Sequence, residues 1–173
     1  NVENIGLENI GVEFSRTGVV TDSMGRTNVD NVFAAGDVNG HHMLAHTAYR
    51  EAEVAVNNIL GIEDCMEYNA IPGVVYTNPE VASVGLTEEQ AQKQGIEYKV
   101  ARYNFASSGK AAAAGDRDGF VKLIFDAENK LRGAHIIGAN VVEMLGEPSV
   151  AMALGATAED LASTIHAHPS LYE

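Results

Sequence analysis

The stretch GFVKLIFDAENKLRGAHIIG, residues 119–138, decides the fold of this chain. Two runs rich in aliphatic and β-branched residues, 119–126 and 131–138, flank the short segment AENK at 127–130. Two such runs on either side of a short connection are typical of a β-hairpin, whose strands are antiparallel. The stretch therefore predicts an antiparallel pair of strands.

Three further strands and a short helix are predicted before this hairpin. The strands are GVVYT (73–77), VASVG (81–85) and IEYKVARYN (96–104). The segment 87–95 is predicted as a helix, because Thr87 and Gln90 have the spacing of a capping box and Gly95 supplies a stop. Strands that do not alternate regularly with helices predict an α+β fold, in which helices flank an antiparallel sheet.

Two helical segments follow the hairpin. The first is predicted from about Val141 to Leu154, with Gly155 as its stop, and Pro148 is expected to kink or split it. The second is predicted over 157–165, with Thr157 as N-cap and Asp160 as its capping-box partner. These helices complete the set that flanks the sheet.

The N-terminal part has a different pattern. GVVTD (18–22) predicts a short strand, and VFAAGD (32–37) predicts a strand buried on both faces of a parallel sheet. Residues 43–60 predict a helix that ends at Gly61. Its expected apolar face consists of Leu44, Ala48, Ala52, Ala55 and Ile59. A shift in composition over 61–73 marks a domain boundary, which divides the chain into residues 1–68 and 69–173.

Composition excludes several classes of protein. The chain has 173 residues, of which 46% are hydrophobic and 20% charged, so we expect a globular protein. Its net charge of −13 argues against nucleic acid and an anionic membrane surface as partners. No apolar run approaches the roughly 20 residues of a membrane helix. The lone cysteine, Cys65, suits the cytoplasm, and a start at Asn1 suggests a piece of a longer protein.

The segment AAGD (34–37) is a candidate ligand site. An Asp just beyond a buried parallel strand, followed by a helix N-terminus, lies where α/β sheets bind ligands. The carboxylate of Asp37 can accept hydrogen bonds from ligand hydroxyls, and the helix that begins near Met43 offers unpaired backbone N–H groups. The alternative is that Asp37 only caps a turn, and the four residues alone favour this alternative.

The tail IHAHPSLYE (165–173) has two interpretations. Ser170 and Glu173 have the spacing of a capping box, so the tail can open a helix after Pro169. Alternatively, His168 is a general base whose imidazole is oriented by Glu173. These nine residues alone favour the cap.

Histidine clusters give little support for a metal site. The two clusters are His41, His42 and His46 in the N-terminal part, and His166 with His168 in the tail. Neither is accompanied by a third ligand at a spacing typical of zinc, so no metal is expected.

Several motifs in order resemble one family over nearly the whole chain. They are TNVDNVFAAGDV (27–38), MLAHTA (43–48), YTNPEVASVGLTE (76–88), FASSGKAAAAGDRDGFVKL (105–123), GAHIIG (133–138) and HAHPSLYE (166–173). Together they resemble the dihydrolipoamide dehydrogenases, which are flavin- and disulfide-containing pyridine nucleotide oxidoreductases. The resemblance implies FAD and NAD as cofactors and reverses the interpretation of the tail.

The resemblance also implies residue roles. His168 would be the catalytic base and Glu173 its carboxylate partner, with Pro169, expected in a cis bond, beside the cofactor. Asp37 would bind the ribityl chain of FAD. Four residues would lie along the flavin, chiefly through backbone groups: Met43, Leu44, Ala45 and His46.

The same resemblance implies how the chain is organised and which partners it binds. Residues 1–68 would be the end of the FAD- and NAD-binding region, and 69–173 the interface domain of a homodimer in which His168 serves the other subunit. The redox disulfide and the glycine-rich phosphate loops would lie upstream. Lipoyl domains of 2-oxo acid dehydrogenase or glycine cleavage complexes would be the partners. Alternatives are a glutathione- or mercuric-reductase-like enzyme, or a non-catalytic dimerisation module.

Overall fold

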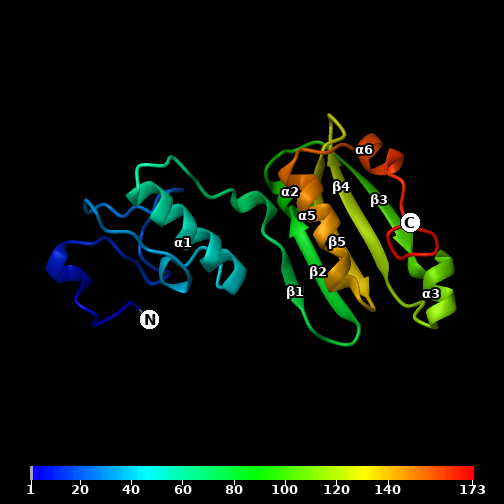
Figure 1. The fold of residues 1–173 in the computed structure, drawn as a ribbon, viewed down its shortest axis with the longest axis horizontal. Helices are drawn as coiled ribbons and strands as arrows, with labels where there is room; N and C mark the ends of the chain where they lie inside the picture. The colour runs from blue at the N-terminus through cyan, green and yellow to red at the C-terminus, as the bar shows by residue number, and fades with distance from the viewer. Residues whose placement is uncertain (1) are drawn as a thin grey trace. The chain divides into compact units, whose positions relative to one another are not determined.

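The chain forms two compact units. The computed structural model describes residues 2–173, and its contacts divide between a first unit that ends at Tyr68 and a second unit, Asn69–Glu173 (Figure 1). Across residues 2–173, no helix combines the length and the apolar character that a membrane span requires.

The second unit is built on a five-stranded sheet. Its strands are β1 (Gly73–Val75), β2 (Glu80–Gly85), β3 (Tyr98–Asn104), β4 (Phe120–Asp126) and β5 (Leu131–Gly138). Their order across the sheet is β1-β2-β5-β4-β3, and every neighbouring pair is antiparallel. The β4–β5 pair is the hairpin that the sequence predicts, with Leu123 opposite Ala134 and a register shift between Ile124 and Phe125. The predicted antiparallel α+β fold is confirmed.

Five helices accompany this sheet. They are α2 (Glu88–Lys93), α3 (Gly109–Ala114), α4 (Val141–Met144), α5 (Gly146–Ala153) and α6 (Ala158–Ser163). Helices α4 and α5 cover the β2 and β5 part of one face, where Val84, Ile136 and Leu145 belong to one buried apolar cluster. Burying such side chains stabilises a domain by roughly 1.5–3 kcal/mol each, so this cluster holds the helices on the sheet.

Short-range sequence patterns predicted where several of these helices begin or end. The capping boxes Thr87–Gln90 and Thr157–Asp160 both form. The expected split near Pro148 is also confirmed, because one helix ends at Met144 and the next begins at Gly146. Pro148 then lies in the first turn of α5, where its missing N–H breaks no helical hydrogen bond.

The first unit contains one long helix and little regular strand. Helix α1 spans Ala45–Ile59, and two short 3-10 helices are η1 (Leu7–Ile10) and η2 (Asp37–Asn39). A third 3-10 helix, η3 (Tyr68–Ala70), begins at the last residue of this unit. The strands predicted at 18–22 and 32–37 do not form. Only isolated bridges occur there, Phe14 with Val19 and Arg26 with Phe33. A strand requires a continuous series of hydrogen-bonded partners along its length. Each of these two segments forms only one bridged residue pair, so neither becomes a strand.

Helix α1 buries a different face from the one predicted. Its buried residues are Thr47, Glu51, Val54 and Ala55, whereas Ile59 is 63% exposed. The predicted face counted only apolar side chains. The real one includes Glu51, because its carboxylate accepts hydrogen bonds from the N–H of Gly36 and the hydroxyl of Tyr68 and is therefore satisfied when buried.

Candidate functional site

His168 and Glu173 form a hydrogen-bonded pair in the C-terminal tail. His168 Nδ1 lies 2.8 Å from Glu173 Oε1. The other oxygen of Glu173 accepts the N–H of Ser170 at 2.9 Å, and the hydroxyl of Ser170 accepts the N–H of Tyr172 at 3.3 Å. These last two bonds are of the kind that opens a helix, so both interpretations of the tail describe real contacts.

The pair has the geometry of a base with an orienting carboxylate. The N–H of Ser170, and after it the imidazole of His168, lower the pKa of Glu173, so its carboxylate is ionised at neutral pH. The side chain of His168 is 80% exposed, and its Nε2 has no hydrogen-bond partner among residues 2–173. An imidazole held through one nitrogen and open at the other can take a proton from an incoming group. The His168–Pro169 bond is cis, as expected.

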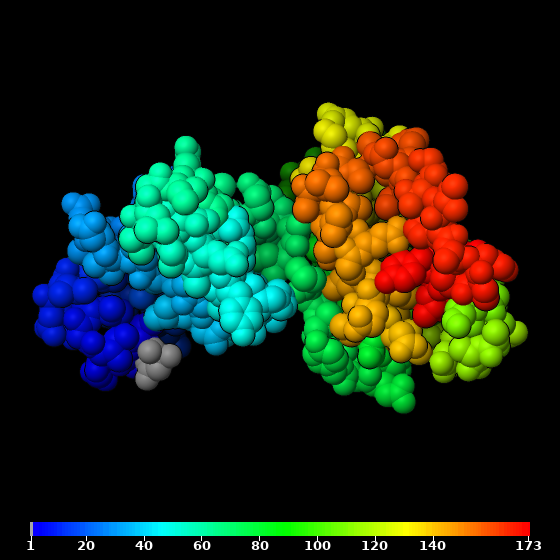
Figure 2. Space-filling view, viewed as in Figure 1, coloured from blue at the N-terminus to red at the C-terminus, as the bar shows by residue number. Residues whose placement is uncertain are grey.

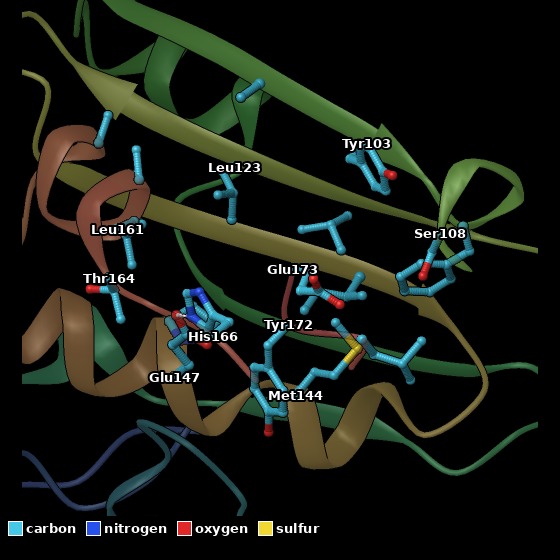
Figure 3. Close-up of a pocket in the computed structure, with 18 of the residues that line it drawn as sticks. Tyr103, Ser108, Leu123, Met144, Glu147, Leu161, Thr164, His166, Tyr172 and Glu173 are labelled. Atoms are coloured by element: carbon cyan, nitrogen blue, oxygen red, sulfur yellow. Dashed lines mark hydrogen bonds and ion pairs between the residues drawn. The ribbon is translucent and has the colours of Figure 1, made fainter. Parts of the chain in front are cut away.

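The tail borders a groove of about 740 Å³ in the second unit (Figure 3). Its floor is the face of β3, β4 and β5, where Tyr103, Leu123 and Ile136 line it. The side chain of Leu161 on α6 forms a second wall. The tail (red) and the segment around α3 (light green) lie side by side on this unit in Figure 2, and Ser108 lines the groove there. The dyad therefore lies beside an apolar hollow.

The AAGD segment lies in the first unit. Asp37 opens η2 directly after Gly36, whose φ of 81° suits glycine. The N–H of Gly36 donates to the buried carboxylate of Glu51 at 2.5 Å, and this hydrogen bond holds the turn against α1. The carboxylate of Asp37 is exposed and accepts no hydrogen bond within residues 2–173, so it is open to a ligand's hydroxyl groups.

The start of α1 has no side-chain cap among the described residues. Leu44 is its N-cap, and the first helical bond runs from the N–H of Ala48 to the carbonyl of Leu44. Ala45 and His46 open the helix, and Met43 just before it is 69% exposed.

One buried hydroxyl is left over at this helix start. Thr47 Oγ1 is buried without a hydrogen-bond partner among the described residues. An uncapped helix N-terminus, an orphaned hydroxyl and the open carboxylate of Asp37 suit a group that carries carbonyls, ring nitrogens and a polyol, as FAD does. These residues fit the cofactor that the resemblance implies.

Two histidines of the first unit, His41 and His42, are in contact with an aromatic ring. The ring of Tyr68 lies 5.0 Å from that of His41 and 5.7 Å from that of His42. Nε2 of His41 is 3.2 Å from the hydroxyl of Thr21. Among residues 2–173, no three His, Cys, Asp or Glu side chains gather as metal ligands would.

Two acidic residues near these sites were not predicted from the sequence. Glu51 supports the turn before Asp37, and Glu147 contacts His166 in the tail. Glu51 and its donor Tyr68 are 17 residues apart, so no short-range pattern marks the burial of Glu51. Glu147 and His166 are 19 residues apart, and no short-range pattern links them.

Comparison with known families gives two matches. The profile described as pyridine nucleotide-disulphide oxidoreductase, dimerisation domain, matches residues 71–173. The profile described as pyridine nucleotide-disulphide oxidoreductase matches residues 1–52. Together they cover most of the chain.

Comparison with curated proteins and solved structures agrees with these family matches. The chain is 46% identical over 176 residues to dihydrolipoyl dehydrogenase from Zymomonas mobilis. The aligned region covers 100% of this chain and 38% of that enzyme. It is 45% identical to the same enzyme from Geobacillus stearothermophilus, with 100% and 37% covered. The crystal structure of LpdA from Mycobacterium tuberculosis matches with a TM-score of 0.91 and 25% identity, over 99% of this chain and 38% of that one.

A second structural neighbour is the HOCl-induced flavoprotein disulfide reductase RclA from Escherichia coli. It matches with a TM-score of 0.82 and 28% identity, over 96% of this chain and 39% of that one. The chain thus spans well under half the length of the curated relatives and solved structures that it matches.

Proposed function

Because this chain belongs to the pyridine nucleotide-disulphide oxidoreductases, we propose that it forms the C-terminal part of a dihydrolipoyl dehydrogenase. Proteins of this family use FAD and NAD. The whole enzyme would oxidise protein-bound dihydrolipoamide and reduce NAD⁺. The curated relatives, which carry this name, support the choice over a glutathione- or mercuric-reductase-like activity.

The observation that carries the proposal is the 2.8 Å contact between His168 and Glu173. His168 takes a proton from a thiol of dihydrolipoamide through its open Nε2, because the thiolate and not the thiol attacks a disulfide. Glu173 holds the other side of the ring and stabilises the imidazolium that forms. Pro169 sets the direction of the chain between them and lies beside the cofactor.

The first unit contributes to the cofactor site. FAD, when bound, would supply the electron carrier between the redox disulfide and NAD⁺. Asp37 would accept hydrogen bonds from its ribityl hydroxyls, and Met43, Leu44, Ala45 and His46 would line the flavin, chiefly through their backbone. Residues 1–68 thus belong to the FAD-binding region, with the end of the NAD-binding region.

The second unit, 69–173, serves as the interface of a homodimer, as the description of its matching family profile supports. His168 then completes the site of the other subunit. Lipoyl domains of 2-oxo acid dehydrogenase or glycine cleavage complexes carry the substrate, and the enzyme works in the cytoplasm. Alone, the chain is a non-catalytic dimerisation module, because the redox disulfide is not among its residues.

The proposal is tested by replacing His168 with Gln in a protein that has the length of the relatives. General acid–base catalysis contributes about 10²- to 10⁴-fold, so dihydrolipoamide turnover should fall by at least about 100-fold. Flavin content, measured by absorbance, should stay near that of the wild type. A loss of turnover below about tenfold would reject His168 as the base.

A further inference from the structure

The catalytic pair of the proposed function has few contacts of its own. Within residues 2–173, the side chains of His168 and Glu173 form hydrogen bonds only to one another and to the N–H of Ser170. Because the His168 side chain is 80% exposed, little packing fixes it. The position of its imidazole is therefore set by what attaches residues 164–173 to the rest of the second unit.

The attachment before His168 is a side-chain contact to α5. His166 Nε2 lies 2.7 Å from Glu147 Oε1, and these side chains are only 21% and 31% exposed (Figure 3). The residues between α6 and His166 provide no comparable anchor. Thr164 bonds back to carbonyls of α6, those of Asp160 and Leu161, and Ile165 is 97% exposed. His166 is thus the first residue after α6 whose side chain is fixed to another element.

The attachment after His168 returns to the same place. Tyr172 donates its hydroxyl to the carbonyl of Glu143 on α4 at 3.1 Å, and Leu171 packs against the buried cluster of the sheet. The rings of Tyr172 and His166 lie parallel, with centroids 6.4 Å apart and an angle of 1° between their planes. The two ends of the tail therefore meet over α4 and α5, and His168 lies in the turn between them.

We infer that Glu147 is a positioning residue for the catalytic base. Glu147 holds the side chain of His166. His166 and Tyr172 together attach the tail to α4 and α5, and the turn between these two residues therefore keeps Nε2 of His168 in one position. A misplacement of about 1 Å can cost on the order of 100-fold in rate, so this contact matters although Glu147 touches no reacting atom. The inference rests on the proposed function, because it requires His168 to be the base.

The test uses Glu147→Ala, Glu147→Gln and His166→Ala in a protein of the relatives' length. We expect Glu147→Ala and His166→Ala each to lower kcat for dihydrolipoamide by roughly 10- to 100-fold, with a smaller effect on KM. The double variant should lose no more than either single variant, because both break the same contact. Glu147→Gln should recover part of kcat, since its amide oxygen still accepts a hydrogen bond.

A second reaction separates positioning from general damage. Reduction of an artificial one-electron acceptor by NADH requires the flavin but no thiol proton, so Glu147→Ala should change it by less than about twofold. Flavin absorbance and Tm should stay close to wild type. Glu89→Ala is the matched control, because Glu89, like Glu147, is an acid in the first turn of its helix, but unlike Glu147 it is exposed and lies on α2, away from the tail contact. It should alter neither reaction.

The outcomes distinguish this inference from the proposed function. If His168→Gln abolishes dihydrolipoamide turnover but Glu147→Ala leaves it intact, Glu147 is not a positioning residue and the proposed function stands. Equal losses in both reactions of Glu147→Ala would also overturn the inference, because they indicate general damage. A normal turnover of His168→Gln would instead reject the proposed function itself.

Discussion

Glu173 divides its two carboxylate oxygens between different partners. One lies against Nδ1 of His168 and the other accepts the N–H of Ser170. A carboxylate beside Nδ1 places the ring proton on that nitrogen and leaves the lone pair of Nε2 free, which is the tautomer a general base requires. The bond to Ser170 keeps the carboxylate from rotating away, so a capping contact also maintains the dyad.

Replacing Glu173 with Gln tests this division. The amide keeps one acceptor oxygen for two donors and loses the negative charge that stabilises imidazolium. We expect turnover of dihydrolipoamide to fall on the order of tenfold, which corresponds to about 1.4 kcal/mol. Steady-state kinetics beside His168→Gln checks the ranking. A Glu173→Gln enzyme as inactive as His168→Gln would mean that Glu173 does more than orient the base.

At the scale of elements, Asp64 fastens the segment after α1 to that helix. Its carboxylate accepts two hydrogen bonds from Arg50 at 2.8 and 2.6 Å, one from Asn57 and one from the N–H of Cys65. The hydrogen bonds from Arg50, and after them the one from Asn57, lower the pKa of Asp64 to about 2. The ionised carboxylate is therefore the form that stabilises this part of the first unit.

The pH dependence of this contribution follows from its sign. A carboxyl group with a lowered pKa stabilises the folded state above its ordinary pKa, and the contribution disappears as pH falls towards the lowered value. Asp64→Asn should therefore lower Tm at neutral pH, and the difference from wild type should shrink between about pH 4 and about pH 2. Differential scanning calorimetry measures it. Asp116→Asn, at an exposed aspartate, is the control, and a Tm difference for Asp64→Asn that is independent of pH would contradict the account.

Elements with local signals could be predicted from the sequence, and others could not. The capping boxes at Thr87 and Thr157 and the hairpin at 119–138 depend on residues close in sequence, so their patterns were sufficient. The strand predicted at 32–37 depends on distant neighbours, and Ala34 bonds instead to the carbonyl of Gly25. Burial of Glu51 likewise depends on a donor 17 residues away, Tyr68.

At the scale of the whole molecule, the candidate site combines parts of different origin. The pairing of His168 with Glu173 was one of two interpretations of the tail, and the family resemblance, not the spacing, favoured it. The contact of Glu147 with His166 was not predicted, since only the packing of the tail on α5 brings them together. The residues that fit a flavin lie in the first unit and the dyad lies in the second. In a homodimer, either subunit's His168 is thus a candidate for a given flavin.

The central claim is that His168 acts as the base in the site of the other subunit, and a hybrid dimer tests it most directly. One subunit would carry His168→Gln and the other a Ser in place of an upstream redox cysteine. If the site is shared, the disulfide of the first subunit and His168 of the second form one intact site. Dihydrolipoamide turnover of the purified hybrid should then reach about half that of the wild type, since one of two sites works, while each mutant homodimer stays nearly inactive. A hybrid as inactive as the homodimers would mean that each subunit uses its own His168, and would contradict the shared site.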